Sequence, residues 1–193
     1  MNINFLGGFM QNIIFLDIDG VLNNSIVIFN EESVNALKEL VMRYNAKVVM
    51  ITSWQGNGTV NIRKRIEKRM EQLGIYDIDF IDPNYEGYIL DIKLPNRLLG
   101  IIDYLKNNDI DNYVILDDEY KKYYKLVCLN HYRTKTLKGL TYNDLNKIDL
   151  EPVNSNNFKY INYQYRPLEN YELVANNLIK VLKKKYECDK NKI

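Results

Sequence analysis

Short unbroken runs of apolar residues alternate along this chain with segments in which apolar residues recur every three or four positions. An unbroken run is typical of a strand buried on both faces, whereas the wider spacing predicts an amphipathic helix. Strands are therefore expected at residues 13–16, 48–51, 78–82, 113–116 and 125–130, and helices at 31–44, 62–74, 96–105 and 120–124. Strands that alternate with helices predict an α/β fold with a doubly wound parallel sheet.

The segments outside this alternation are less regular. Residues 83–95 contain two prolines and a glycine, and we expect a loop there. A short helix should follow residue 140, and residues 159–165 should form an edge strand. Residues 169–187 have the spacing of a terminal amphipathic helix. Five basic residues in the helix at 62–74 are interpreted as a solvated face rather than a phosphate-binding patch.

Composition narrows the classes of protein and of site. The chain has 193 residues, enough for one α/β domain at 1–150, with 151–193 as an extension whose terminal helix packs on it. The net charge of +1 gives no reason to expect a nucleic acid or a membrane. Cys128 and Cys188 lack metal-binding spacing and fit a reduced, cytoplasmic chain, and the single histidine, His131, argues against His-based sites. No apolar stretch reaches the roughly 18 residues of a membrane-spanning helix.

Polar residues stand at the ends of three of the expected strands. The pairs are Asp17 and Asp19, Thr52 and Ser53, and Asp117 and Asp118. Because parallel strands end at the same edge of a sheet, where open α/β folds bind their ligands, we expect these side chains to converge. Gly20 lets the chain turn sharply there or approach a ligand closely.

Asp17, Asp117 and Asp118 would repel one another in one crevice. Two carboxylates about 4 Å apart cost about 4 kcal/mol at an effective dielectric constant near 20, so either one is protonated or a divalent cation is bound. Oxygen ligands without nearby Cys or His favour Mg²⁺ over zinc. A carboxylate neutralised in this way can attack a bound phosphate and form an aspartyl-phosphate. Asp19 is then placed to protonate the leaving oxygen and later to activate water.

At this point the sequence resembles the haloacid dehalogenase (HAD) superfamily. Residues 17–21 are similar to its motif I, the hydroxyl after the strand at 48–51 to motif II, and Asp117-Asp118 to motif IV. The resemblance covers roughly 13–140 and implies a HAD-like Rossmannoid fold. Within the superfamily, the chain resembles the HAD domains that occur alone in bacteria and viruses or are joined to ligase and kinase modules in RNA-repair (Swiss Army Knife) proteins.

The resemblance implies a role for each matching residue. Asp17 would be the nucleophile and a metal ligand, and Asp19 the general acid/base, with its main-chain carbonyl also on Mg²⁺. Thr52 would be the motif II hydroxyl, with Ser53 as the fallback, and Asp118 the metal-binding acid of motif IV. Asp117 would hold a metal-bound water or the motif III cation. Both Lys93 and Arg97 fit that cation, and Arg97 is slightly favoured. Gly20, Ser53 and Trp54 are assigned to substrate binding.

The spacing between the motifs leaves no room for a large cap domain. An uncovered crevice accepts a phosphate displayed on a macromolecule more easily than it encloses a free metabolite. We therefore expect a Mg²⁺-dependent phosphatase acting on nucleic-acid ends, or on a nucleotide if Trp54, Tyr85 or Tyr88 stacks on the base. The alternatives are a phosphoprotein or small-metabolite phosphatase, and a HAD-fold binding protein without turnover. The oligomeric state and the role of residues 150–193 stay open.

Overall fold

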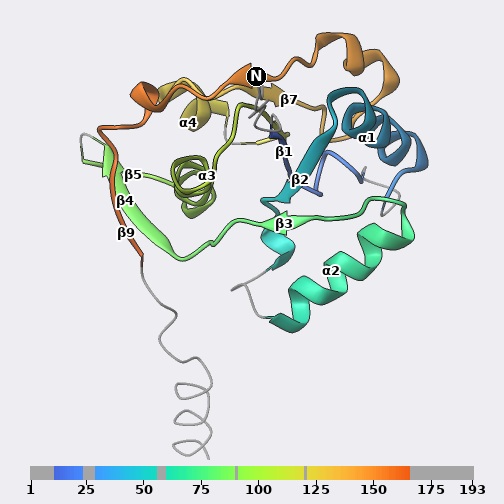
Figure 1. The fold of residues 1–193 in the computed structure, drawn as a ribbon, viewed down its shortest axis with the longest axis horizontal. Coiled ribbons are helices and arrows are strands. Elements are labelled where there is room, and N and C mark those ends of the chain that lie inside the picture. The colour runs from blue at the N-terminus through green and yellow to red at the C-terminus, as the bar shows by residue number, and fades with distance from the viewer. Residues whose placement is uncertain (1–10, 24–28, 56–59, 90, 120, 166–193) are drawn as a thin grey trace, which may run out of the picture.

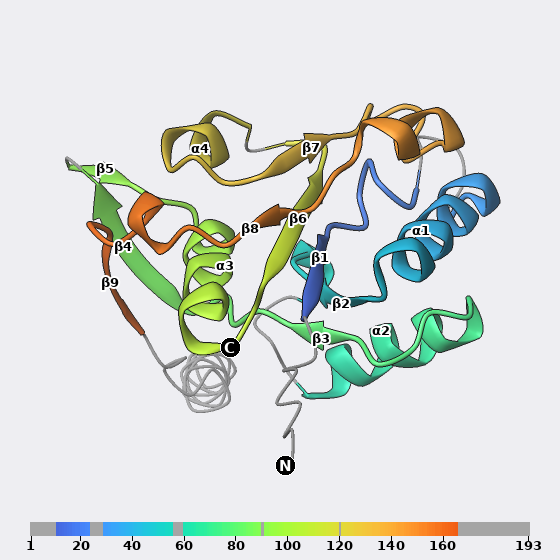
Figure 2. The same ribbon diagram turned by 45° about the horizontal axis from the view of Figure 1, so that its top comes forward.

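The computed structural model describes residues 11–23, 29–55, 60–89, 91–119 and 121–165. Its main sheet is parallel in the order β3-β2-β1-β6-β7, and β8 pairs with β6 in the antiparallel sense (Figures 1 and 2). The strands are β1 (Asn12–Leu16), β2 (Ala46–Met50), β3 (Asp79–Phe80), β6 (Asn112–Asp117), β7 (His131–Arg133) and β8 (Glu151–Pro152). The predicted doubly wound α/β fold is confirmed.

Helices cover both faces of this sheet (Figure 1). They are α1 (Glu31–Tyr44), α2 (Val60–Gln72), α3 (Asn96–Asn107) and α4 (Lys121–Leu126), with short 3₁₀ helices η1 (Ser53–Gln55), η2 (Tyr142–Lys147) and η3 (Ser155–Asn157). Ile14 and Leu16 of β1 pack with α1 and α2, whereas Ile13 and Phe15 pack with α3. Because successive strand residues point to opposite faces, an uninterrupted apolar run supplies both cores.

Local capping explains where α1 begins and ends. The Asn30 side chain accepts hydrogen bonds from the backbone N–H groups of Glu32 and Ser33, and Glu31 and Glu32 lie in the first turn, where the helix dipole favours negative charge. The helix ends at Asn45, which adopts a left-handed conformation with φ 45°. The helix predicted at residues 31–44 is therefore confirmed.

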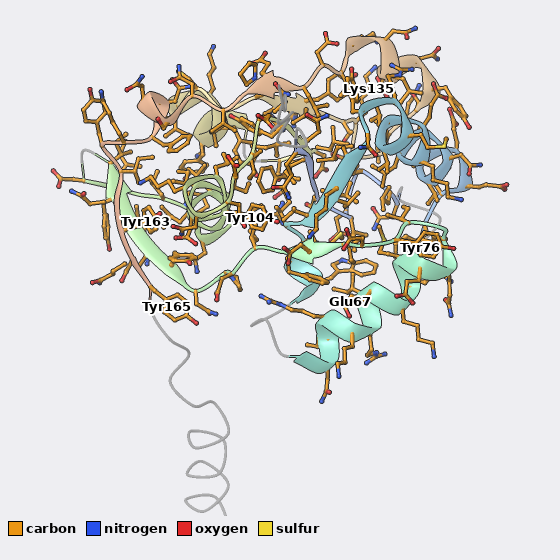
Figure 3. All side chains as sticks on the ribbon, in the orientation of Figure 1. Glu67, Tyr76, Tyr104, Lys135, Tyr163 and Tyr165 are labelled. Atoms are coloured by element: carbon orange, nitrogen blue, oxygen red, sulfur yellow. The ribbon has the colours of Figure 1, made fainter. Side chains whose placement is uncertain are left out.

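The segment expected to be a loop at residues 83–95 instead belongs to a second sheet. It contributes β4 (Tyr85–Ile89) and β5 (Ile92–Lys93), and β9 (Asn162–Tyr165) completes an antiparallel sheet in the order β5-β4-β9. The ring of Tyr85 packs edge-on against Tyr163 and Tyr165, which Figure 3 labels along β9. The loop prediction is wrong because the stabilising partner, β9, lies far away in the sequence. The expected edge strand at 159–165 is confirmed.

The prediction of a strand at residues 125–130 is also wrong. Lys125 and Leu126 end α4, and the strand that pairs with β6 is β7, at His131–Arg133. Val127 and Leu129 are buried in the connection between them, where Cys128 has a left-handed φ of 49°. Burial against the core therefore explains this apolar run without a strand.

Other predictions concern the ends of the chain and its relation to a membrane. The predicted terminal helix, and with it most of the extension at 151–193, lies outside the described residues. Over the residues that the structure describes, no helix has both the length and the apolar character needed to cross a bilayer. The described part of the chain also contains no large cap domain over the main sheet.

Candidate active site

Three buried aspartates meet at the carboxyl edge of the main sheet. β1 and β6 pair with Leu16 opposite Leu116, and the N–H of Asp17 donates to the carbonyl of Leu116 at 3.0 Å. Asp17 and Asp117 therefore stand side by side, and Asp118 follows. One carboxylate oxygen from each of the three aspartates lies within 4.8 Å of the others. The structure thus brings these carboxylates together, as the strand ends predict.

Arg97 is the cation that contacts this cluster. It lies in the first turn of α3, and its Nη1 is 2.7 Å from Asp17 Oδ2 and 2.7 Å from Asp117 Oδ2. Lys93, the other candidate, lies on β5 in the second sheet, where its Nζ is 3.2 Å from Glu86 Oε1 and its side chain is 63% exposed. The structure therefore places Arg97 at the cluster and Lys93 in a surface ion pair away from it.

The carboxylate of Asp117 has two further donors. Its Oδ1 accepts the backbone N–H of Glu119 at 2.7 Å, and its Oδ2 accepts the hydroxyl of Tyr124 at 2.8 Å. Tyr124 comes from α4 and is fully buried. Tyr124 was not among the site residues expected from the sequence. Its inward position on the helix after the acidic pair was the available signal, but one tyrosine among 16 does not stand out.

Asp19 lies in a turn beside the buried cluster. Its Oδ1 accepts the side-chain N–H of Asn23, and its Oδ2 accepts the indole N–H of Trp54, both at 2.7 Å. The backbone N–H of Gly20 donates to Asn23 Oδ1 at 2.7 Å, which ties the turn together. These contacts fix the direction of the half-buried Asp19 carboxylate.

Gly20 allows this turn to lie against Asp118. Its φ is +66°, a conformation that side chains disfavour, and a Cβ at this position would overlap the Asp118 carboxylate. The Gly20 carbonyl accepts the buried hydroxyl of Thr134 at 2.7 Å. The predicted substrate-binding glycine therefore has a structural reason to be there, because it brings the loop and the acid of β6 into contact.

Thr52 and Ser53 follow β2, the neighbour of β1. Ile51 donates its N–H to the carbonyl of Leu16 at 2.9 Å, which carries the chain to the same edge as Asp17. Thr52 is 1% exposed, and its Oγ1 accepts the backbone N–H of Trp54 at 3.2 Å, whereas Ser53 is exposed at the start of η1. The buried Thr52 is thus the more restrained of the two hydroxyls.

Burial and charge together shift the acid–base properties of the cluster. Burial raises the pKa of Asp17 from 3.8 to about 6, the charge of Arg97 opposes this shift and Asp117 adds to it. Burial alone would lower the pKa of Arg97, but the charges of Asp17 and Asp117 outweigh it and raise the pKa above its ordinary value. Arg97 is thus a permanent cation, and Asp17 is held as a carboxylate at neutral pH against the cost of its burial.

The donor set suits a hard divalent cation. Asp17, Asp117 and Asp118 supply only oxygen atoms, and among the described residues the single guanidinium in contact with two of them does not balance three carboxylates. Such a cluster can hold a metal ion.

Comparison with known proteins agrees with this geometry. A family model described as "HAD domain in Swiss Army Knife RNA repair proteins" matches residues 13–145, which include the whole cluster. The chain belongs to this HAD family. The match confirms the resemblance given by the motifs, and membership indicates a phosphatase-type function. Searches of curated proteins and of solved structures returned no match.

Proposed function

We propose that this HAD domain is a Mg²⁺-dependent phosphatase that forms an aspartyl-phosphate on Asp17. The observation that carries the proposal is the arrangement of Asp17, with Oδ2 on Arg97 and an oxygen within 4.8 Å of those of Asp117 and Asp118. A buried carboxylate beside a fixed cation is the arrangement that a phosphoryl acceptor requires.

Asp17, Asp117 and Asp118 would hold the Mg²⁺, together with the main-chain carbonyl of Asp19. When bound, the ion supplies positive charge that offsets the carboxylates and the phosphoryl oxygens. Arg97 provides a second, permanent positive charge at the same place. Both charges favour the ionised form of Asp17, which is the form that can attack phosphorus.

The proposed reaction has two steps, phosphoryl transfer to Asp17 and hydrolysis of the aspartyl-phosphate. A carboxylate oxygen of Asp17 attacks phosphorus, the bond from phosphorus to the leaving oxygen breaks, and Asp19 gives that oxygen a proton. Water then attacks the phosphoryl group, Asp19 takes a proton from this water, and the Asp17 carboxylate is released with inorganic phosphate. The hydrogen bonds from Asn23 and Trp54 support this role because they hold Asp19 in one orientation.

Thr52 supplies the proposed hydroxyl donor. Because its Oγ1 accepts the backbone N–H of Trp54, the hydroxyl proton can be donated to a phosphoryl oxygen. Ser53 remains the alternative donor because it is adjacent and exposed.

The described residues include no large cap domain over the main sheet. A site without such a cap favours a phosphate carried by a larger molecule, such as a nucleic-acid end or a nucleotide. We therefore propose phosphorylated nucleic-acid ends or nucleotides as substrates.

Hydrolysis of a chromogenic aryl phosphate tests the proposed chemistry. Activity should require Mg²⁺, disappear with a chelator and fall at least about a thousandfold in Asp17→Asn, because the covalent route is lost. The control is Asp103→Asn, which changes an aspartate of α3 that contacts Tyr85 and Tyr163 instead. Wild-type turnover in Asp17→Asn would refute the assignment of the nucleophile.

A further inference from the structure

A cavity of about 410 Å³ opens beside the proposed active site. Its walls include the rings of Phe29 and Trp54 and the aliphatic side chains of Ile62 and Ile66 from α2. Arg65 and Arg69 of the same helix also line it. The volume falls within the range that encloses small organic ligands, about 300–1,000 Å³.

Two residues connect this cavity to the proposed chemistry. Ile18, which also lines it, lies between Asp17 and Asp19 in the chain. Trp54 lines the cavity with its ring and donates its indole N–H to Asp19 at 2.7 Å. Since Asp19 is the proposed donor of a proton to the leaving oxygen, the leaving group must lie next to Asp19. The cavity is therefore on the leaving-group side of the site.

The walls favour a flat aromatic ligand with negative charge. Phe29 and Trp54 meet edge to face, with ring centroids 5.9 Å apart, and the guanidinium carbon of Arg69 lies 5.1 Å from the centroid of the Phe29 ring. Aromatic rings and guanidinium planes are the groups on which nucleobases stack, and guanidiniums also bind phosphate. Among the described residues that line the cavity, none is acidic.

Arg65 and Arg69 differ from Arg63 and Lys68 of α2 because they line the cavity. Arg63 lies over the Phe80 ring and donates to the carbonyl of Ile81, and Lys68 is exposed outside the cavity. Arg65 and Arg69 are exposed, as the predicted solvated face requires, and they also line the cavity.

We infer that this cavity binds the terminal nucleotide of a phosphorylated oligonucleotide as the leaving group. Its base would occupy the aromatic part beside Trp54 and Phe29, and Arg65 and Arg69 would bind the next phosphate of the strand. This inference rests on the proposed function, because the leaving-group side is defined by the role of Asp19. It adds a ligand site whose residues are separate from the aspartate cluster.

The fluorescence of Trp54 tests this site directly, because Trp54 is the only tryptophan in the chain. Asp17→Asn protein with Mg²⁺ is titrated with adenosine 3′,5′-bisphosphate, ribose 5-phosphate and inorganic phosphate, with excitation at wavelengths that the base does not absorb. The bisphosphate should change the fluorescence saturably. The two probes without a base should bind at least about tenfold more weakly.

Variants of α2 distinguish binding inside the cavity from general attraction by the positive charge of the helix. In the Asp17→Asn protein, a second substitution, Arg65→Ala or Arg69→Ala, should weaken binding of the bisphosphate about tenfold, because a guanidinium contact is lost. Adding Lys68→Ala, which removes one positive charge from the same helix outside the cavity, should change affinity less than about twofold. Equal affinity for ribose 5-phosphate and the bisphosphate, or equal losses in all three variants, would overturn the inference.

Turnover distinguishes this inference from the proposed function. Oligonucleotides with a 3′ or a 5′ terminal phosphate are compared with the same strands carrying an abasic terminal nucleotide. Hydrolysis without a preference for the base overturns the cavity assignment and leaves the phosphatase in place. Saturable binding of the bisphosphate without hydrolysis of any substrate supports the cavity and overturns the phosphatase.

Discussion

Acidic residues have opposite environments in two regions of the molecule, the carboxyl edge of the main sheet and the small antiparallel sheet. Asp17 is 3% exposed, and its pKa is raised to about 6 because burial outweighs the contact with Arg97. Asp103, beside the small sheet, is half-buried and accepts the hydroxyls of Tyr85 and Tyr163. The burial of Asp17 costs stability and concentrates charge at the edge of the main sheet. Asp103 instead accepts hydrogen bonds from neutral donors. This difference supports the proposal that catalysis takes place at the edge of the main sheet and that the small sheet has a structural role.

Between the two regions, the strongest contrast in activity is expected from their two cations. Arg97→Met should lower phosphate release from an aryl phosphate about 10²- to 10³-fold, because the charge that faces the phosphoryl group is lost. Lys93→Met should change it less than about twofold, because the exposed Lys93 side chain pairs with Glu86 of the small sheet and not with the aspartates. Steady-state kinetics of both variants provide the measurement. A larger loss in Lys93→Met than in Arg97→Met would reverse the assignment of the cation.

A glycine in each region gives the next comparison. In Gly20→Ala the methyl group overlaps the Asp118 carboxylate, so Mg²⁺ affinity should fall about tenfold or more. In Gly87→Ala the methyl group would lie 2.7 Å from the carbonyl oxygen of Asn162, so the pairing of β4 with β9 should be strained at a cost of about 1–3 kcal/mol.

Calorimetric Mg²⁺ titration and urea unfolding measure these two effects. Gly87→Ala should keep the Mg²⁺ affinity of the wild type while losing stability. If it lost Mg²⁺ affinity as Gly20→Ala does, the two regions would not be independent.

The same substitution at an aspartate of each region should change stability in opposite directions. Because the folded pKa of Asp17 is raised from 3.8 to about 6, the metal-free protein loses stability as pH rises through this window. Asp17→Asn should remove that loss and raise the free energy of unfolding at pH 7.5 by about 1–3 kcal/mol. Asp103→Asn should lower it by about 1 kcal/mol, because a charge-assisted hydrogen bond is weakened.

Urea unfolding of both variants at pH 5 and pH 7.5 without metal provides the measurement. The gain in Asp17→Asn should be smaller at pH 5, where the wild-type Asp17 is mostly protonated in the folded state. A destabilised Asp17→Asn protein at pH 7.5 would contradict the account of the buried charge.

The smallest expected effect concerns two tyrosine hydroxyls. Tyr124→Phe removes a donor to Asp117 and should lower kcat about three- to tenfold, because Arg97 and the Glu119 N–H still hold that carboxylate. Tyr163→Phe removes a donor to Asp103 and should leave kcat within about twofold. An equal fall in kcat in both variants, measured by steady-state kinetics, would show that Tyr124 acts only through overall stability.

The edge of the main sheet could be predicted because it depends on local signals. Apolar runs predict the buried strands, and Asp17 and Asp117 follow these runs directly. The choice between Lys93 and Arg97 was not local, because both lie within a few residues of the start of α3. It depends on how that helix is directed toward β1, which only the packed structure shows.

Strands β4, β5 and β7 could not be predicted for a related reason. β4 has a mixed polar sequence with a central glycine, and its pairing with β9 joins Tyr85 to Tyr165 across a long stretch of chain. The apolar run around Val127 has the composition of a strand, but it fills the core from a connecting segment. In both cases, tertiary contacts outweighed the local pattern.

Locating the phosphoryl group on the protein shows directly whether Asp17 is the nucleophile. The wild-type enzyme is quenched in acid during turnover of an aryl phosphate with Mg²⁺ and reduced with borohydride, which converts an aspartyl-phosphate to homoserine, and its peptides are sequenced by mass spectrometry. The account predicts homoserine at position 17, dependent on substrate and Mg²⁺. Sustained turnover with no modification at Asp17, or with modification at another aspartate, would contradict it.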